Sequence, residues 1–189
     1  MLTNKDIGVA PKIDLYVIKA LDNNLNGDIN NVIEAVDYSI EEKVDIILMS
    51  FGTLKYSIKL ESVINRALRN NIVVISSVGN YGLQENSEIL YPAKFEGVIA
   101  VGALNMNDDI WKGTTVGNGL NVLLTGHYIK SYSKDGSFLY SSGTSMAAAY
   151  MAGLAALFFE EYSSDNKYTI SKNLDKINGY SVMNTDKFF

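Results

Sequence analysis

The sequence has no cysteine, which excludes disulfide bonds and thiolate metal sites. It also lacks an excess of positive charge: 16 lysine and arginine residues stand against 21 aspartate and glutamate residues, for a net charge of −5. Nucleic acids and anionic membranes are bound through basic patches, so this balance argues against both as partners. No apolar run approaches the roughly 20 residues that span a bilayer. The first residues, MLTNKDIGVAP, lack the charged-then-apolar pattern of a secretion signal.

Histidine is almost absent, because His127 is the only one in the chain. A serine nucleophile needs a general base within hydrogen-bond reach, and histidine is the commonest such base. A serine hydrolase site in this chain must therefore use His127, a base of another residue type, or a base from another polypeptide segment.

The 189 residues, 47% of them hydrophobic, are enough for one domain with a sizeable core, which we expect to span 1–189. Short apolar runs alternate with longer amphipathic ones. This alternation predicts parallel βαβ units and an α/β fold of three layers, with helices on both sides of a mostly parallel sheet. The expected strands are 13–20, 44–52, 71–80 and 97–104, and the expected helices are 28–43, 57–70, 144–162 and about 168–178, the last stopped by Gly179. Residues 104–140 are expected to form irregular β-structure.

The most distinctive motif is SSGTSMAAAYMAG at 141–153, in which Ser145 precedes a run of small residues that predicts a helix. It is not the G-x-S-x-G nucleophile elbow, because Ala147 stands at the last glycine position. No histidine follows Ser145, as the order of α/β-hydrolases requires, and no GDSGG-like segment is present.

Two predicted strands end in small residues, at Ser50-Phe51-Gly52 and at Ser77-Val78-Gly79-Asn80. In an open parallel sheet, ligands bind outside the carboxyl ends of the strands. Either stretch taken alone also fits an ordinary turn from a strand into a helix.

The motifs taken together resemble the subtilisin-like serine protease family. GTSMAAAYMAG at 143–153 resembles the family's serine motif. Four further segments resemble the family in the family's order: GVAP at 8–11, MSFG at 49–52, VVISSVGN at 73–80 and YPAKFEGVIAVGAL at 91–104. A collinear set of this kind is much more specific than one short motif.

The resemblance implies the chemistry of peptide-bond hydrolysis. Ser145 would be the nucleophile, at a helix N-terminus that favours developing negative charge. The backbone N–H of Ser145 and the side-chain amide of Asn80 would hold the oxyanion. By the same resemblance, Tyr91-Pro92 would carry a cis peptide bond. Peptide substrate would be bound by two strand ends and one pocket-floor residue that excludes large side chains: Ser50, Phe51, Gly52, Ser77, Val78, Gly79 and Leu90.

The family's aspartate and histidine motifs, D-T/S-G and H-G-T-x-V-A-G, are both missing from the chain. GVAP, which follows the histidine helix in the family, begins here at residue 8. The position of His127 is not catalytic in the family, so we interpret it as a loop histidine, and Asp135 as a solvated turn residue. The expectation is a fragment, incomplete at its N-terminus and inactive alone.

The gap also has a structural consequence. In the family, the strand that carries the aspartate lies between the strands equivalent to 13–20 and 44–50. Either these two strands close up here, or a slot with unpaired N–H and C=O groups remains between them.

No cofactor is expected. The family often binds calcium, and DNNLNGD at 22–28 has the residue spacing at the start of an EF-hand calcium loop. The twelfth position of such a loop, counted from Asp22, requires a glutamate and is Ile33 here. We therefore assign no metal ligands and expect a polar turn, with Asp28 capping the helix that follows. The sequence itself leaves the compartment open, and the resemblance implies an extracellular or cell-surface location.

Three functions remain open. The chain is part of an endopeptidase that associates with its missing N-terminal segment, a non-catalytic peptide-binding relative, or a remnant with no function of its own. The expected partners are a peptide or protein substrate and, for the first function, the missing segment.

Overall fold

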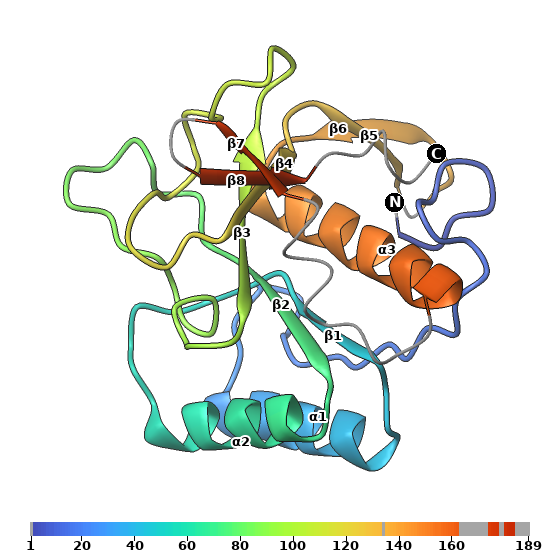
Figure 1. Cartoon of the computed structure of the whole chain (residues 1–189), viewed down its shortest axis with the longest axis vertical. Coiled ribbons are helices and arrows are strands. Elements are labelled where there is room, and N and C mark those ends of the chain that lie inside the picture. Colours follow the sequence, from blue (N-terminus) through green and yellow to red (C-terminus); the bar gives the residue numbers. More distant parts are fainter. Residues whose placement is uncertain (1, 134, 163–173, 178–179, 184–189) are drawn as a thin grey trace.

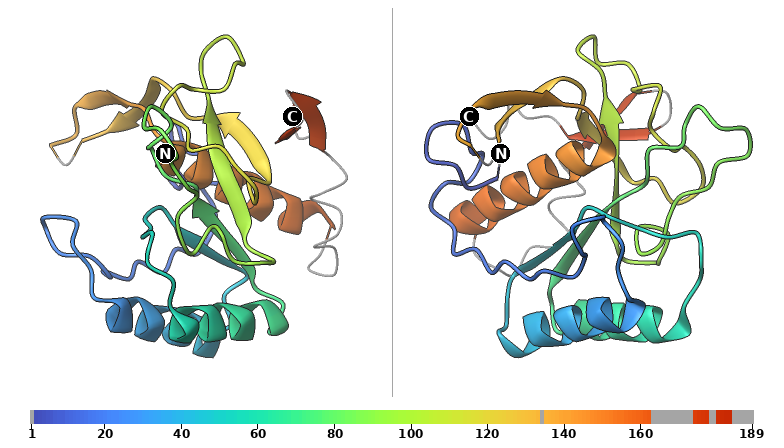
Figure 2. Two further views of the ribbon diagram at one scale, coloured as in Figure 1. Left: turned by 90° about the vertical axis from the view of Figure 1, so that its left-hand side faces the viewer. Right: turned by 180° about the vertical axis from the view of Figure 1, so that it is seen from behind.

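A computed structural model describes residues 2–133, 135–162, 174–177 and 180–183, and for the last two ranges only the backbone. A six-stranded sheet runs in the order β1-β2-β3-β4-β8-β7, and all its neighbouring strands are parallel except the β7–β8 pair. Helix α3 covers one face, and α1 and α2 cover the other (Figures 1 and 2). The predicted three-layer α/β fold is therefore confirmed. The sheet strands are β1 (Ile46–Met49), β2 (Val73–Ser77), β3 (Ile99–Leu104), β4 (Val122–Thr125), β7 (Leu174–Ile177) and β8 (Tyr180–Met183).

Helices α1 (Ile29–Glu41) and α2 (Ile58–Arg69) begin at residues whose side chains cap them. The Asp28 carboxylate accepts a hydrogen bond from the N–H of Asn30, at 2.7 Å, as the sequence predicted. The Ser57 hydroxyl accepts one from the N–H of Leu60, at 3.3 Å. Each helix turns an apolar stripe toward the sheet, and the buried stripe of α2 has helical spacing: Leu60, Val63, Ile64 and Ala67.

Helix α3 (Thr144–Tyr162) is apolar on nearly every side and is the centre of the larger core cluster. Its buried residues pack against β2, β3 and β4. A helix with apolar residues all round is stable only when it is buried, and α3 lies between the sheet and the N-terminal residues. Gly153 marks that second contact, because a Cβ there would lie 2.6 Å from the Cβ of Val9.

Phe158→Ala is expected to lower the free energy of unfolding by about 3–5 kcal/mol, because the Phe158 ring is fully buried in this cluster. Urea denaturation followed by circular dichroism measures the change. Phe138→Ala is the matched control, since Phe138 is 52% exposed, and its cost is expected to stay below about 1 kcal/mol. Equal costs for the two variants would contradict the placement of α3.

The prediction of a strand at 13–20 is wrong. No backbone hydrogen bond joins these residues to any other described residue, and β1 pairs only with β2 within the described part of the chain. The physical reason is that residues 13–20 and β1 do not close up, so no described strand lies beside residues 13–20 to pair with them.

The prediction of a helix at about 168–178 is also wrong where it is tested. Residues 174–177 form β7, which pairs antiparallel with β8, while 168–173 lie outside the described residues. The missed signal is Asn-Gly at 178–179, a two-residue hairpin signature that was interpreted as a helix stop. In the expected irregular region, β4 joins the main sheet, and β5 (Ile129–Tyr132) pairs with β6 (Phe138–Ser141) as a separate ribbon.

Candidate active site

Ser145 lies at the second position of α3, beside the carboxyl end of β1. Its hydroxyl donates a hydrogen bond to the backbone oxygen of Ser50, at 3.0 Å. The Ser50 hydroxyl in turn donates to the backbone oxygen of Ser145, at 3.3 Å. This reciprocal pair joins two residues that the sequence analysis had placed at one site from separate motifs.

Asn80 is the second site residue that the fold brings to the start of α3. Its side-chain oxygen accepts two hydrogen bonds from Thr144, one from the N–H and one from the hydroxyl, both at 2.9 Å. An oxygen with two donors fixes the orientation of the amide, so the NH₂ group of Asn80 is directed away from Thr144. The N–H of Ser145 belongs to the first turn of α3 and has no acceptor within the helix. The site therefore has two donors of the kind that can hold an oxyanion.

Thr144 is a residue that the sequence analysis missed. It is 1% exposed and fixes Asn80 through both of its donors. The available signal was its place directly before the candidate nucleophile, where a threonine can satisfy groups at a helix start.

No base contacts Ser145 in the described part of the chain, since its hydroxyl is directed to a main-chain oxygen. The His127 ring instead stacks on Trp111, with centroids 6.1 Å apart, and its buried Nδ1 has no hydrogen-bond partner among the described residues. Asp135 is an exposed turn residue, as interpreted from the sequence. Its carboxylate accepts hydrogen bonds from the hydroxyl and the N–H of Ser137, at 2.7 and 3.0 Å, and these bonds lower its pKa.

The two predicted walls of the substrate pocket lie on either side of Leu90. A Cβ added at Gly52 would lie 2.7 Å from the Cβ of Leu90, and one added at Gly79 would lie 3.0 Å from its Cδ1. The N–H of Leu90 donates to the oxygen of Val78, at 3.1 Å, which holds Leu90 against the second wall. Leu90 is buried and takes up space between the walls.

The remaining predicted residues are placed as follows. Ser77 is buried at the end of β2, and the side chain of Phe51 packs toward the core cluster of α1 and α2, which leaves its backbone for contacts at the strand end. The peptide bond of Tyr91-Pro92 is cis, as the resemblance implied. Tyr91 and Thr53 exchange two backbone hydrogen bonds of 2.9 Å, which tie the Leu90 segment to the stretch after Gly52.

No cluster of three or more His, Asp or Glu side chains among the described residues is placed to hold a metal ion. In the loop at 22–28, one Asp22 carboxylate oxygen accepts hydrogen bonds from the N–H groups of Asn24 and Asn26, at 2.8 and 2.9 Å. These hydrogen bonds hold the turn at 22–28 together. Among the described helices, none combines the length and hydropathy needed to cross a membrane.

The sequence was compared with protein families and with known proteins. A sequence model of the Subtilase family matches residues 2–177. Subtilisin NAT of Bacillus subtilis subsp. natto is 33% identical over 175 residues, which are 92% of this chain and 46% of that protein. The thermostable alkaline protease of Halalkalibacterium halodurans is 35% identical over 172 residues, 91% of this chain and 46% of that protein. The chain thus spans about half the length of these curated relatives.

Solved structures agree in fold. A cold adapted subtilisin-like serine proteinase superposes with a TM-score of 0.83 at 23% identity, over 93% of this chain and 68% of that one. The prenylagaramide maturation protease PagA superposes with a TM-score of 0.74, also at 23% identity, over 83% of this chain and 61% of that one. With the family match covering nearly the whole sequence, the chain belongs to the subtilase family of serine proteases.

Proposed function

We propose that this chain contributes the nucleophile and the oxyanion donors to a subtilisin-like serine endopeptidase, and that its acid and base come from another segment. The observation that carries the proposal is the site at the start of α3. There, Thr144 orients the Asn80 amide beside Ser145, while the Ser145 hydroxyl contacts no base among the residues that the structure describes.

In the proposed reaction, the Ser145 oxygen attacks a peptide carbonyl, and a base takes its proton. The carbonyl oxygen becomes an oxyanion, held by the N–H of Ser145 and the NH₂ of Asn80. The helix N-terminus favours this negative charge. The base then gives the proton to the leaving amine, and water hydrolyses the acyl-enzyme. Without a base, the first proton transfer has no acceptor within the described residues, so the chain alone is expected to be inactive.

We propose that substrate binds as an extended strand along Ser50 to Gly52, with its first side chain between the two walls. Main-chain pairing at a strand edge gives affinity without sequence preference, and the pocket adds the preference. Because Leu90 takes up space between Gly52 and Gly79, the substrate side chain there is expected to be small. The family resemblance supports an extracellular or cell-surface location for this activity.

Leu90→Ala is expected to enlarge this pocket. In a complemented enzyme, the ratio of kcat/KM for a phenylalanine substrate to that for an alanine substrate should rise at least about 10-fold, since pocket contacts of one or two carbons discriminate on this scale. Met106→Ala, in an exposed loop, should leave the ratio unchanged. An unchanged ratio in Leu90→Ala would place the specificity pocket elsewhere.

One observation favours a second function, peptide binding without hydrolysis. The Ser145 hydroxyl already donates a hydrogen bond to the backbone oxygen of Ser50, so its proton is not directed toward a base. A peptide-binding relative would bind substrate-like peptides equally well before and after Ser145→Ala and would gain no activity when the missing segment is supplied.

A further inference from the structure

The 111–115 segment connects β3 to the loop that begins at Asn80. On the side of β3, the N–H of Trp111 donates a hydrogen bond to the backbone oxygen of Ala103, at 2.9 Å. The Thr114 hydroxyl donates to the same oxygen, at 2.8 Å, and accepts a hydrogen bond from the N–H of Ala103, at 3.1 Å. Ala103 is fully buried in β3, so these bonds attach the segment to the core of the main sheet.

On its other side, the segment holds the two residues that flank Asn80. The backbone N–H of Thr115 donates to the oxygen of Gly79, at 3.1 Å. The Thr115 hydroxyl accepts a hydrogen bond from the N–H of Tyr81, at 3.0 Å. One buried threonine therefore fixes the backbone immediately before and immediately after Asn80.

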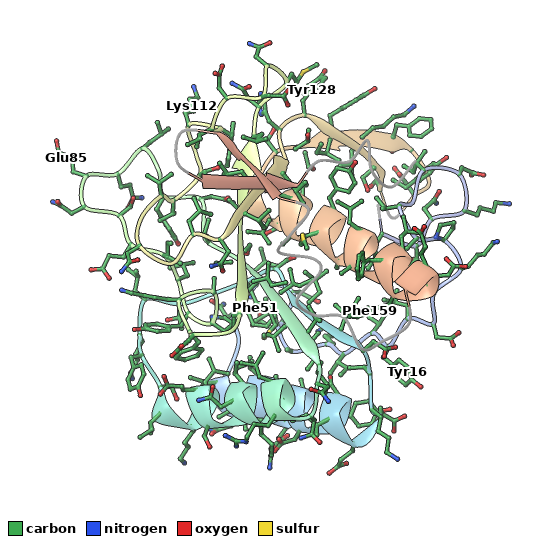
Figure 3. All side chains as sticks on the ribbon, in the orientation of Figure 1. Tyr16, Phe51, Glu85, Lys112, Tyr128 and Phe159 are labelled. Carbon is green, nitrogen blue, oxygen red and sulfur yellow. The ribbon has the colours of Figure 1, made fainter. Side chains whose placement is uncertain are left out.

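The loop after β2 depends on this attachment because it has little burial of its own. Residues 80–86 are all exposed, whereas β2 is buried along its whole length. A further bond runs from the N–H of Gly82 to the oxygen of Gly113, at 3.0 Å. Figure 3 shows Lys112, from the segment, and Glu85, from the loop, on the same side of the molecule. Exposed segments with few buried contacts open most readily, so these bonds determine where the loop lies.

The 111–115 segment is itself held firmly by its aromatic residue. A Cβ at Gly113 would overlap the Trp111 ring, so the ring lies directly against the backbone of the segment. The other contacts of the Trp111 ring are with the core cluster of α3 and with the stacked ring of His127. The segment can therefore act as a fixed support for the loop.

We propose that Thr115 is a positioning residue for the oxyanion donor, an inference that rests on the role of Asn80 in the proposed function. Thr144 fixes the side-chain oxygen of Asn80 from α3, while Thr115 fixes the backbone on both sides of Asn80 from β3. A donor that is oriented before the substrate arrives stabilises an oxyanion without reorganisation. Because Thr115 is 0% exposed, it acts through Asn80 and does not touch the substrate.

The hydroxyl of Thr115 is the group that a substitution should remove. Valine has nearly the shape of threonine, but its methyl group accepts no hydrogen bond. In Thr115→Val the N–H of Tyr81 loses its acceptor, and a methyl carbon at 3.0 Å from that nitrogen would be closer than the roughly 3.5 Å of a favourable contact. The site has no spare room, since a Cβ at Gly79 would lie 3.3 Å from the Thr115 Oγ1. The backbone on both sides of Asn80 is therefore expected to shift.

In a complemented enzyme, Thr115→Val is expected to lower kcat by about 10-fold and to leave KM unchanged. This is part of the factor of about 10² to 10³ that complete loss of an oxyanion donor costs in a subtilisin. Thr115→Ser keeps the hydroxyl and should keep kcat. Ser39→Ala is the control, because it removes another buried hydroxyl, which bonds the oxygen of Ala35 within α1, and it should not change kcat.

A double-mutant cycle distinguishes positioning of Asn80 from a general structural role. In the Asn80→Asp background, Thr115→Val should lower kcat no further, because the donor through which Thr115 acts is already lost. Equal losses of kcat in the two backgrounds would overturn the proposal, since the effect would then not pass through Asn80.

Nuclear magnetic resonance of the unfused chain tests the inference without any activity. In Thr115→Val, the Tyr81 amide should exchange at least about 10-fold faster, because it loses its hydrogen bond. The side-chain NH₂ signals of Asn80, assigned by their loss in Asn80→Asp, should shift. Thr115→Ser and Ser39→Ala should change neither. If Thr115→Val does not fold, Thr115→Ala removes the same hydroxyl without placing a methyl group against the Tyr81 amide, and the same two changes are expected.

The two proposals fail in different ways. Unchanged Tyr81 exchange and unchanged Asn80 signals in the Thr115 variants would overturn the positioning role, whatever the activity of the complemented enzyme. An inactive complemented enzyme whose unfused chain shows both changes would refute the peptidase proposal and would still support the placement of Asn80 by Thr115.

Discussion

Under the proposed function, the chain is expected to become a peptidase when the corresponding N-terminal part of a relative is supplied by fusion. In the chimera we envisage, the part of subtilisin NAT that precedes its matched region is joined to residue 2 of this chain. Hydrolysis of a chromogenic peptide should appear in the chimera and be absent from the chain alone. The proposal predicts this result because the added segment brings a base to the proposed nucleophile and oxyanion donors.

Two variants of the chimera show whether the rate comes from this site. Replacement of its motif histidine by alanine should lower kcat by about 10⁶, a factor measured in a subtilisin rather than obtained from this geometry. Ser145→Ala should lower it as far. A chimera that unfolds cooperatively, gives the circular dichroism of an α/β protein and hydrolyses nothing would refute the proposed function.

The second large effect is expected at Asn80. In the active chimera, Asn80→Asp should lower kcat by about 10² to 10³, again a range measured in a subtilisin, because an oxyanion donor is replaced by an acceptor. The variant keeps an oxygen for the two donors of Thr144, and its charge lies at the start of α3, where the helix dipole favours it. Its free energy of unfolding should therefore change little.

Asn80→Ala is the informative partner of that variant. It should lose activity to a similar degree and also lose about 0.5–2 kcal/mol of stability, because both donors of Thr144 lose their acceptor. Urea denaturation of the two variants separates the structural role from the catalytic one. If Asn80→Asp kept its full kcat, the amide would have no part in holding the oxyanion.

The sequence predicted the central fold well where local patterns determine it. The α2 stripe has helical spacing, the β2 run is apolar on both faces, and the Asp28 cap precedes α1 directly. Each of these features depends on residues a few positions apart. The meeting of Ser50 and Ser145, 95 residues apart, was predicted only through a resemblance, because no local rule specifies it.

The errors come from pairing that local patterns do not contain. The run at 13–20 has the composition of a strand, but a strand needs a neighbour, and none of the described residues supplies one. At 174–177 the sequence pattern predicted a helix, but these residues form a strand because they pair with β8. Thr144 was missed because its role depends on Asn80, which is far away in the sequence but adjacent in the fold.

The most direct test of the account is labelling of the purified 189-residue chain by a fluorophosphonate probe, with Ser145→Ala as the control. Such probes react with a serine that a base activates. The account predicts that the folded chain is labelled no faster than Ser145→Ala, because the Ser145 hydroxyl donates to a backbone oxygen and contacts no base in the described part of the chain. Labelling that is lost in Ser145→Ala would show an activated serine in the chain alone, and it would contradict the claim that another segment must supply the base.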